Sequence, residues 1–424
     1  MGGEWRQSTW GEEISLEYGK RIRGYKDTKA PYRVYGSNGP VGWTQEPFVD
    51  GPGVILGRKG AYRGIEYSPH PFSVIDTAYW VKPKRDLDMR WLYYAIIHYK
   101  LGEIDDGSPI PSTTRSAVYV RELLVPPIVE QRAIAHILGM LDDKIELNRK
   151  VNRTLEAMAQ ALFKSWFIDF DPVVVNALRA GNPVPDKFAE RAAHYRDNPD
   201  ALRLPEETLR LFPDRFQDSE LGPIPEGWSV QSLDDIATFL NGLACQKYPA
   251  APGEPSLPVI KIRELRQGIS GNTDRATTNV PEKYIVHDGD VLFSWSGSLL
   301  IDIWTQGKGV LNQHVFKVSS DNYPKWFYFH WVDFHLLEFQ RIAADKATTM
   351  GHIKRHHLAD ARVVVPDSDI MKLASVHVSP IFDNKIENAI QARSLAKLRD
   401  TLLPKLISGE LRVPDVDKLL EDAL

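Results

Sequence analysis

The residues of this chain that could carry chemistry are few and dispersed. The sequence contains no G-x-x-x-x-G-K-[ST] phosphate loop and no H-E-x-x-H zinc motif. Among its twelve histidines, His352, His356 and His357 lie close together, but the spacing places no third ligand for a metal ion. The single cysteine, Cys245, can form neither an internal disulfide nor a cysteine-rich zinc site, which is typical of a protein in a reducing cytoplasm.

One constellation has the residue types of a metal-dependent nuclease. Asp367, followed by Asp383 and Lys385 in a D-x-K spacing, formally supplies two carboxylates for Mg²⁺ and a lysine beside a scissile phosphate. Asp383 opens a helical segment, however, and so does its counterpart Asp142, where the helix dipole alone favours acidic residues. A Mg²⁺-dependent nuclease is therefore an alternative interpretation.

Two loops combine basic, glycine, hydroxyl and aromatic residues in a way that suits nucleic acid. Residues 57–63, Gly-Arg-Lys-Gly-Ala-Tyr-Arg, directly follow a predicted strand, and residues 294–298, Ser-Trp-Ser-Gly-Ser, are their counterpart. Glycine N–H groups can approach a phosphate backbone closely, and arginine can reach guanine edges. For one loop alone, a solvated hairpin is the alternative interpretation. The same loop recurring with different side chains is what two domains that read different DNA sequences would need.

Further loops at comparable places extend this set of candidates. Residues 35–39 compare with 262–265, and residues 112–115 compare with 348–355. Their hydroxyl and amide groups suit phosphates and adenine edges. The candidate DNA-contacting residues are Lys20, Arg21, Ser37, Asn38, Arg58, Lys59, Gly60, Tyr62, Arg63, Thr113 and Arg115 in the first half, and Lys247, Lys261, Arg263, Ser294, Trp295, Ser296, Gln313, His314, Thr348, His352, Lys354 and Arg355 in the second.

These loops occur twice because the chain is an internal repeat. Residues 90–94, Arg-Trp-Leu-Tyr-Tyr, recur as 325–329, Lys-Trp-Phe-Tyr-Phe, and residues 142–146 recur as 383–387. The offset between matching residues drifts from 223 to 241, as loop insertions require. Self-similarity of this kind indicates one structural unit built twice. We expect a globular unit, a helix, a linker, a second globular unit and a second helix.

Each globular unit is predicted to be α+β. Short β-rich runs such as 53–57 and 290–294 are bounded by turn-forming residues, and one aromatic-rich helix per unit is expected near 89–99 and 324–340. The linker contains short helical pieces around 186–196 and 205–211. The expected boundaries are 1–125 for the first domain, 126–170 for the first long helix, 171–227 for the linker, 228–365 for the second domain, and 366–424 for the second helix and tail.

The two long helices are predicted to pair with each other. In the first, apolar or small residues alternate by three and four, with asparagines at the remaining seam positions, and in the second a similar stripe ends where Pro404 and later Gly409 interrupt it. Seam asparagines set register in coiled coils, which favours pairing over packing on the helix's own domain. The first seam would span ~33 Å, close to the ~34–36 Å of one DNA turn. The seam residues are Ile145, Asn148, Asn152, Leu155, Ala159, Leu162 and Trp166, and Ile386, Leu395, Leu398 and Leu402.

Composition predicts a folded protein of the cytoplasm. Hydrophobic residues are 43% and charged residues 25% of the chain, no apolar run approaches the ~18 residues that cross a bilayer, and residues 1–6 have no features of a signal peptide. The net charge is 52 − 56 = −4, which argues weakly against nucleic acid when the chain is taken whole. The acidity is concentrated in the linker, where 7 Lys and Arg face 11 Asp and Glu.

Five segments of the sequence resemble the specificity subunits of type I restriction-modification systems. The most distinctive is Pro-Pro-Ile-Val-Glu-Gln-Arg-Ala-Ile-Ala at 126–135, and the others are 138–148, 159–172, 220–228 and 398–411. The resemblance covers nearly the whole chain. It implies a non-catalytic subunit of a prokaryotic adenine methyltransferase/endonuclease complex, in which two target recognition domains each read half of a split, asymmetric DNA site. It also implies that the two conserved helices form an antiparallel coiled coil.

The resemblance implies partners and cofactors as well. Two modification subunits carrying S-adenosylmethionine would dock on the conserved helices, and restriction subunits with an ATP-driven motor and Mg²⁺ would join them, while this chain would hold no cofactor or metal. In agreement, residues 125–128 lack the first and last residues of the [NDS]-P-P-[FYW] methyltransferase motif. A free-standing DNA-binding regulator is a further alternative, but it would not need docking stripes on two helices. The implied docking residues are Gln131, Arg132, Asp143, Lys144, Phe163, Trp166, Phe167 and Phe170.

The second scaffold copy departs from the first. Residues 365–378 lack the Glu-Gln-Arg of residues 130–132, which allows the two docking surfaces to differ. Free of its partners, a chain with a net charge of −4 should bind DNA poorly, because phosphate neutralisation would come largely from basic modification subunits.

Overall fold

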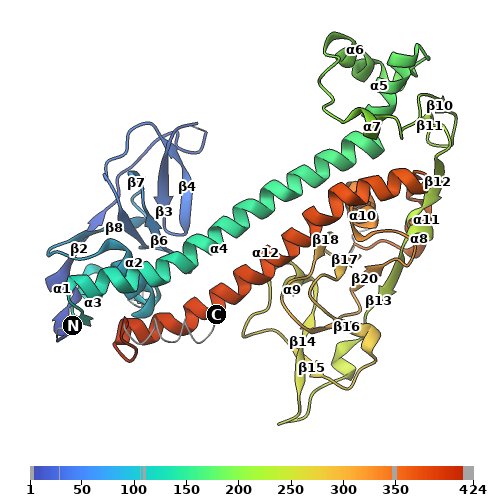
Figure 1. Ribbon diagram of the computed structural model, residues 1–424. Coiled ribbons are helices and arrows are strands. Elements are labelled where there is room, and N and C mark those ends of the chain that lie inside the picture. Colours follow the sequence, from blue (N-terminus) through green and yellow to red (C-terminus); the bar gives the residue numbers. More distant parts are fainter. Residues whose placement is uncertain (1–3, 28, 106, 108–110, 346–350, 414–424) are drawn as a thin grey trace. The chain divides into compact units, whose positions relative to one another are not determined.

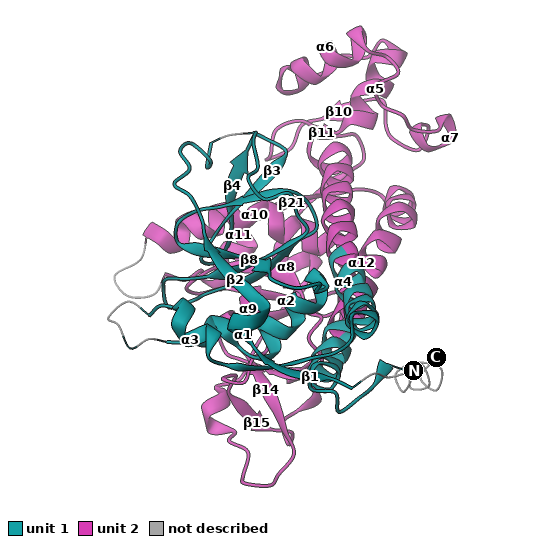
Figure 2. Cartoon of the chain, turned by 90° about the vertical axis from the view of Figure 1, so that its left-hand side faces the viewer, with its two compact units in different colours: residues 1–146, 394–424 teal, residues 147–393 magenta. Residues whose placement is uncertain are grey.

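The computed structural model describes residues 4–27, 29–105, 107, 111–345 and 351–413. The chain divides into two compact units, which Figure 2 colours separately. Unit 1 combines residues 1–146 with 394–424, and unit 2 holds residues 147–393. Within the described ranges, no helix combines the length and the apolar character needed to span a bilayer.

Unit 1 contains two small sheets and a strand pair, covered by short helices (Figure 1). The strand order is β2-β8-β5-β6 in the antiparallel sheet and β4-β3-β7 in the mixed one, where β3 runs parallel to β7. The strands are β1 (Arg6–Thr9), β2 (Ile14–Tyr18), β3 (Tyr32–Gly36), β4 (Gly39–Thr44), β5 (Gly53–Gly57), β6 (Ile65–Ser68), β7 (Phe72–Val74), β8 (Ala78–Pro83) and β9 (Glu122–Val125), which pairs with β1. The helices are α1 (Trp10–Glu13), α2 (Met89–His98), the 3-10 turn η1 (Leu101–Glu103) and α3 (Arg115–Tyr119).

Unit 2 repeats this architecture. Its antiparallel sheet has the order β13-β20-β17-β18, and its mixed sheet has the order β15-β14-β19-β16 with β14 parallel to β19. The strands are β12 (Ser229–Ser232), β13 (Thr238–Asn241), β14 (Ser256–Ile260), β15 (Arg275–Thr277), β16 (Ile285–Val286), β17 (Val291–Ser294), β18 (Leu300–Ile303), β19 (Gly309–Leu311), β20 (Val315–Ser319) and β21 (Arg362–Val365), which pairs with β12. The helices are α8 (Leu233–Ile236), η4 (Cys245–Lys247), α9 (Ile262–Gln267), η5 (Glu282–Tyr284), α10 (Lys325–Asp345) and α11 (Arg355–Asp360).

The repeat extends to local capping chemistry. In unit 1 the N–H of Thr9 donates to the Glu12 carboxylate at 3.1 Å at the beginning of α1. In unit 2 the N–H of Ser232 donates to the Asp235 carboxylate at 3.0 Å at the beginning of α8. Each pair satisfies backbone groups that a first helical turn leaves free. The α+β fold predicted for two repeated units is confirmed.

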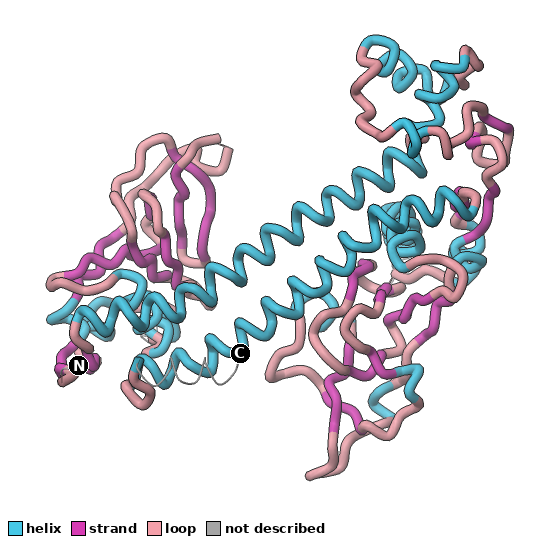
Figure 3. The backbone as a smooth tube through the Cα atoms, viewed as in Figure 1, coloured by secondary structure: helices cyan, strands magenta, loops and turns pink. Residues whose placement is uncertain are grey.

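Two long helices, α4 (Ile128–Phe163) and α12 (Ser368–Ser408), pair in an antiparallel manner (Figures 1 and 3). The amide of Asn152 donates to the carbonyl of Lys385 at 2.8 Å and accepts from Asn388 at 3.1 Å. Asn148 is buried and donates to Gln391 at 2.8 Å. The predicted helix pairing is confirmed, and its seam asparagines bond across the pair, as register-setting residues do.

The prediction that Pro404 interrupts the second helix is wrong. Helix α12 continues through Pro404 to Ser408 and ends before Gly409, which has a φ of +78°. A mid-helix proline costs about 3 kcal/mol, and burial of the surrounding apolar residues offsets this cost. These residues, Leu402, Leu403, Leu406 and Ile407, lie in the core of unit 1. Leu398, which was expected in the seam, is 37% exposed.

The core of each unit is completed by a helix end from the other half of the sequence. In unit 1 the C-terminal turns of α12 pack with Trp10, Trp91 and Leu138. In unit 2 the end of α4 and the π-helical turn η2 (Lys164–Ile168) bury Phe163, Trp166 and Phe167. The linker packs there too, through α5 (Asp171–Ala180), η3 (Asp186–Phe188), α6 (Ala189–Asp197), α7 (Glu206–Leu209) and the strand pair β10 (Phe216–Gln217) and β11 (Ile224–Pro225).

His330 is buried in the core of unit 2. Its side chain is 4% exposed, stacks on Phe163 with ring centroids 4.9 Å apart, and meets Phe382 edge-on. Burial, assisted by the positive charge of Lys385, lowers the pKa of His330 to about 3. The folded protein therefore holds this imidazole in its neutral form.

Acid should destabilise the protein through His330, and His330→Phe should reduce this sensitivity. The unfolded chain takes up the proton near pH 6.5, so folded-state stability is lost as the pH falls from about 6.5 towards 3. At pH 5 the expected loss of unfolding free energy is about 2 kcal/mol. Urea unfolding at pH 7.5 and pH 5 measures it, with the exposed His194→Phe as control. Equal pH dependence in the wild type and His330→Phe would contradict this assignment.

Candidate nucleic-acid interface

The turn after β5 in unit 1 and the turn after β17 in unit 2 are held by the same backbone hydrogen bonds. The N–H of Arg58 donates to the carbonyl of Thr77 at 3.0 Å, and the N–H of Trp295 donates to the carbonyl of His314 at 3.4 Å. Arg58 and Trp295 therefore occupy one structural position, and Thr77 and His314 occupy another. The two sheets therefore end in turns with the same backbone arrangement but with different side chains.

A third segment closes this end of the sheet in both units. Lys59 forms an isolated β-bridge with Ser112, and Ser296 forms the corresponding bridge with His352. Ser112 and His352 therefore occupy equivalent positions, each in its own unit, as the comparison of residues 112–115 with 348–355 predicts. Thr348 lies outside the described residues.

Two arginines of unit 1 lie over a tyrosine at the edge of the sheet. The guanidinium carbon of Arg115 is 4.2 Å from the ring centroid of Tyr18, and that of Arg58 is 5.1 Å from it. Arg115 also pairs with Glu17 at 3.7 Å. Burial raises the pKa of the neighbouring Tyr79 well above its usual value, so its phenol remains neutral. Cation–π contact holds both guanidinium groups in place while their charge is retained.

Other candidates in unit 1 brace the loops. Arg63 donates to the carbonyls of Gly60, Gly102 and Ile104 at 2.8–3.0 Å, which gives it a structural role. The hydroxyl of Ser37 donates to the carbonyl of Thr77 at 2.5 Å. Thr113 is buried. These three residues fix the frame, and their contact with DNA stays a prediction.

The remaining candidates in unit 1 face solvent. Tyr62 is 79% exposed, and the ammonium of Lys20 lies 4.7 Å from the ring centroid of Phe48. Gly60 has a φ of +110°, a conformation that favours glycine and lets the loop turn sharply. Arg21, Asn38 and Lys59 are also exposed.

In unit 2 the equivalent loop is aromatic and uncharged. The indole N–H of Trp295 donates to Asn241 at 3.1 Å, and the Trp295 ring stacks on Phe316 at 5.8 Å. The hydroxyl of Ser296 and Nδ1 of His314 lie 3.0 Å apart, with the proton donor set by the histidine tautomer. Ser294 is buried and donates to the carbonyl of Ser298 at 2.8 Å.

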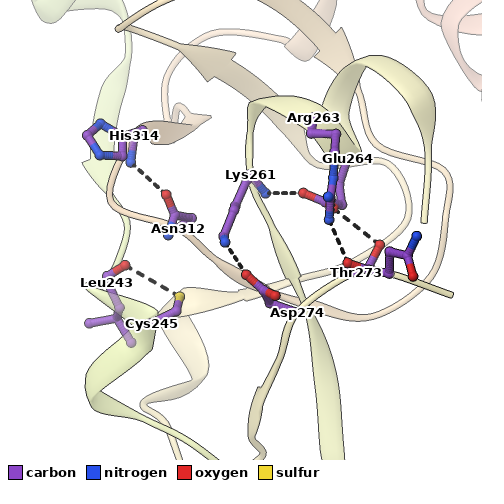
Figure 4. Close-up of polar contacts among 10 residues, drawn as sticks. Leu243, Cys245, Lys261, Arg263, Glu264, Thr273, Asp274, Asn312 and His314 are labelled. Atoms are coloured by element: carbon purple, nitrogen blue, oxygen red, sulfur yellow. Dashed lines mark hydrogen bonds and ion pairs between the residues drawn. The ribbon is translucent and has the colours of Figure 1, made fainter. Parts of the chain in front are cut away.

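Two further candidates in unit 2 belong to a polar network beside β14 (Figure 4). Lys261 forms an ion pair with Asp274, and the guanidinium of Arg263 donates to the buried carboxylate of Glu264 at 2.6 Å. The hydroxyl of Thr273 donates to the same carboxylate at 3.2 Å. Their charges are therefore paired within the chain. The other candidates, Lys247, Lys354 and Arg355, are exposed, and Gln313 and His352 are half-buried.

Of the residues expected to dock partner subunits, some are exposed and others are buried. Arg132 and Lys144 are exposed, and Asp143 forms a bidentate pair with Arg90 at 2.6 and 2.9 Å. Gln131 is buried, where it accepts from the N–H of Asp88 and donates to the carbonyl of Pro126. The four aromatic residues Phe163, Trp166, Phe167 and Phe170 lie in the core of unit 2, so they present no free surface to a partner.

An exposed apolar stripe runs along α4, and sequence reasoning missed it. It consists of large side chains that are 38–75% exposed and that share one helical face within about 40°, because their spacings of 11, 7, 4 and 7 residues approximate whole turns. The signal was available in the sequence, as a second apolar periodicity beside the seam. The stripe residues are Val129, Met140, Leu147, Val151 and Met158.

Helix α12 does not carry an equivalent stripe. At the offset of 241 the stripe positions correspond to Ile370, Ile381, Asn388, Ala392 and Arg399. Ile370 is buried, and Arg399 donates to Asp142 at 2.6 Å. The two scaffold copies therefore present different surfaces.

The nuclease constellation is not assembled. Asp367 caps α12 by accepting from the N–H groups of Asp369 and Ile370, and Lys385 pairs with Glu156 at 3.2 Å. Asp383 lies 16 residues further along the same helix, or ~24 Å away, too far to share a metal ion with Asp367. Among the described residues no group of three or more His, Cys, Asp or Glu could hold a metal ion.

The known proteins to which this chain is similar come from one family. Residues 225–393 match the family model described as type I restriction modification DNA specificity domain. The HindI specificity subunit of Haemophilus influenzae is 25% identical over 340 residues, 74% of each chain. The MjaIX specificity subunit of Methanocaldococcus jannaschii is 26% identical over 345 residues, 79% of this chain and 72% of that one.

The fold is similar to that of a solved structure. The crystal structure of the type I restriction-modification S subunit from M. genitalium aligns with a TM-score of 0.59 over 95% of this chain and 96% of that one. The sequence identity in this alignment is 14%, so the likeness concerns the fold alone.

Proposed function

Because the chain belongs to the type I restriction-modification specificity subunits, the non-catalytic DNA-reading components of these systems, we propose that each of its two repeated domains reads one half of a split DNA site. The observation that carries this proposal is the pair of equivalent sheet ends. Their backbone hydrogen bonds match, while Arg58 and Lys59 in one are replaced by Trp295 and Ser296 in the other. Such a frame allows two domains of one fold to prefer two different sequences.

The first domain is proposed to use charge in its recognition. Arg58 is held over Tyr18 with its guanidinium charge retained, so it is preorganised for the O6 and N7 acceptors of a guanine. Lys59, the next residue, is exposed and is suited to bind a phosphate. The second domain has no charge at these two positions, so we infer that shape, stacking and neutral hydrogen bonds contribute more to its reading.

Arg58→Ala is expected to weaken specific binding of the assembled methyltransferase by about 1–3 kcal/mol and to relax preference in the first half-site alone. Lys59→Ala should weaken binding to all sequences and lower the slope of log K against log salt by about 1. Competition binding at several salt concentrations measures both effects. Arg85→Ala removes the same charge beyond the other end of β8 and serves as the control. Relaxed preference in both half-sites would contradict separate reading.

We further propose that the modification subunits dock along α4. The exposed stripe from Val129 to Met158 supports this, because a soluble protein seldom leaves large apolar side chains aligned on one face without a partner. A helix of the partner would fit a stripe with these spacings. The exposed residues Arg132 and Lys144 lie on the same helix and would supply polar contacts. S-adenosylmethionine, ATP and Mg²⁺ would all be bound by the partner subunits.

A further inference from the structure

Two short turns occupy equivalent places beside the proposed DNA-reading loops. Turn 75–78, Ile-Asp-Thr-Ala, is closed by a hydrogen bond of 3.1 Å from its fourth N–H to its first carbonyl. Turn 312–315, Asn-Gln-His-Val, is closed by the same bond at 3.0 Å. Each turn leads from a buried strand of the mixed sheet into a strand of the antiparallel sheet. Asp76 in unit 1 therefore corresponds to Gln313 in unit 2.

The turn that carries Asp76 is braced on both sides. The carbonyl of Thr77 accepts from the hydroxyl of Ser37 at 2.5 Å and from the N–H of Arg58 at 3.0 Å. The carbonyl of Asp76 accepts from the guanidinium of Arg58 at 2.9 Å. The backbone of Asp76 is thereby held next to the arginine proposed to read guanine.

The Asp76 carboxylate is exposed, and in the described part of the chain no hydrogen bond or ion pair to it is found. Aspartate in a turn commonly bonds the backbone N–H two residues on, but here that N–H, of Ala78, donates to the carbonyl of Ile75. Its surroundings are cationic, with Lys20, Arg58 and Lys59 at the same end of the sheet. Phosphate repels a carboxylate, so contact with the DNA backbone does not explain this residue.

A carboxylate at neutral pH only accepts hydrogen bonds. In the major groove, cytosine N4 and adenine N6 offer amino donors, whereas guanine offers two acceptors and thymine an acceptor and a methyl group. Resting on the proposed reading of one half-site by the first domain, we propose that Asp76 is a specificity-determining residue that accepts from the amino group of a cytosine or adenine in that half-site. Gln313, which both donates and accepts, is the corresponding residue of the second domain.

The test compares Asp76→Asn and Asp76→Ala with the wild type, each assembled with its modification subunits. Methylated sites are mapped across DNA carrying every sequence variant of the site. Asparagine can also donate, so Asp76→Asn should raise methylation of sites with guanine or thymine at one position of the first half-site by about tenfold. Asp76→Ala should lose the preference for an amino group at that position. Asp86→Asn, the same change beyond the other end of β8, should leave all preferences as they are.

Unchanged base preference in both Asp76 variants, or a change confined to the second half-site, would overturn the proposal. A uniform gain in affinity for all sequences would also overturn it, because it would show that the carboxylate only repels phosphate. Failure of the proposed function would look different, since the wild-type complex would then methylate without any defined two-part site. Melting temperatures of the three variants verify that the exposed substitutions leave the fold intact.

Discussion

Replacing Leu147 and Val151 by glutamate is expected to abolish stable assembly of this subunit with its modification subunits. Burying a large aliphatic side chain contributes about 1.5–3 kcal/mol, and a buried unpaired carboxylate opposes binding by several kcal/mol more. Two such changes in the middle of the α4 stripe should raise the Kd by roughly a thousandfold or more. Size-exclusion chromatography of the purified components, followed by titration calorimetry, measures the loss.

The matched control uses another face of the same helix. Ala157 and Gln160 are exposed on α4 and lie about 100° and about 160° from the centre of the stripe, so Ala157→Glu with Gln160→Glu adds the same charge elsewhere. The control should assemble normally. Because Leu147 and Val151 are exposed in the chain itself, both pairs of substitutions should leave the melting temperature within about 1–2 °C of the wild type. Normal assembly of the stripe variant would show that the modification subunits do not dock on the α4 stripe.

Lengthening the helix pair is expected to lengthen the spacer between the two proposed half-sites. Each long helix begins in one unit and ends in the other, and the division falls after residue 146 in α4 and after residue 393 in α12. These points are opposite in the antiparallel register, since Asp142 pairs with Arg399 and Asn148 with Gln391. Duplicating residues 143–146 and 390–393 would add one matched turn of ~6 Å to both helices. The preferred spacer should then grow by one or two base pairs.

Mapping of methylated adenines in DNA exposed to the insertion variant tests this expectation. Both half-site sequences should stay the same, because residues 1–146 and 147–393 remain intact within their units. A four-residue insert also rotates the following helix by about 40°, which local unwinding of the pair can absorb. Insertion into α4 alone is the control, since it breaks the asparagine register and should impair assembly. An unchanged spacer with full activity would mean that the modification subunits set the distance.

Long-range features with a clear periodic or repeated pattern could be predicted from the sequence. The repeat predicted two α+β units, and the polar residues Asn148 and Asn152 at heptad positions predicted the helix pair. Pro404 shows where local rules fail. Its helix-breaking tendency is overcome by Leu402, Leu403, Leu406 and Ile407, whose burial depends on unit 1 and is invisible in the local sequence.

The sequence predicted that the two candidate loops follow equivalent strands, but it did not assign the roles of their residues. Arg58 and Arg63 are both basic residues beside glycine, yet Arg63 donates to three carbonyls and Arg58 lies over Tyr18. Asp76 was missed because its turn shares no residue with turn 312–315, and only matching backbone hydrogen bonds relate the two. The family resemblance implied that Phe163, Trp166, Phe167 and Phe170 dock a partner, although they lie in the core of unit 2.

The discontinuity of unit 1 has a consequence for synthesis on the ribosome. Unit 2 is one continuous stretch, residues 147–393, so its chain is complete before α12 is finished. Unit 1 lacks part of its core until Leu402, Leu403, Leu406 and Ile407 have emerged, more than 250 residues after its own last strand, β9. The first domain to be translated is therefore the last to close. During that interval its unburied apolar surface is prone to aggregation.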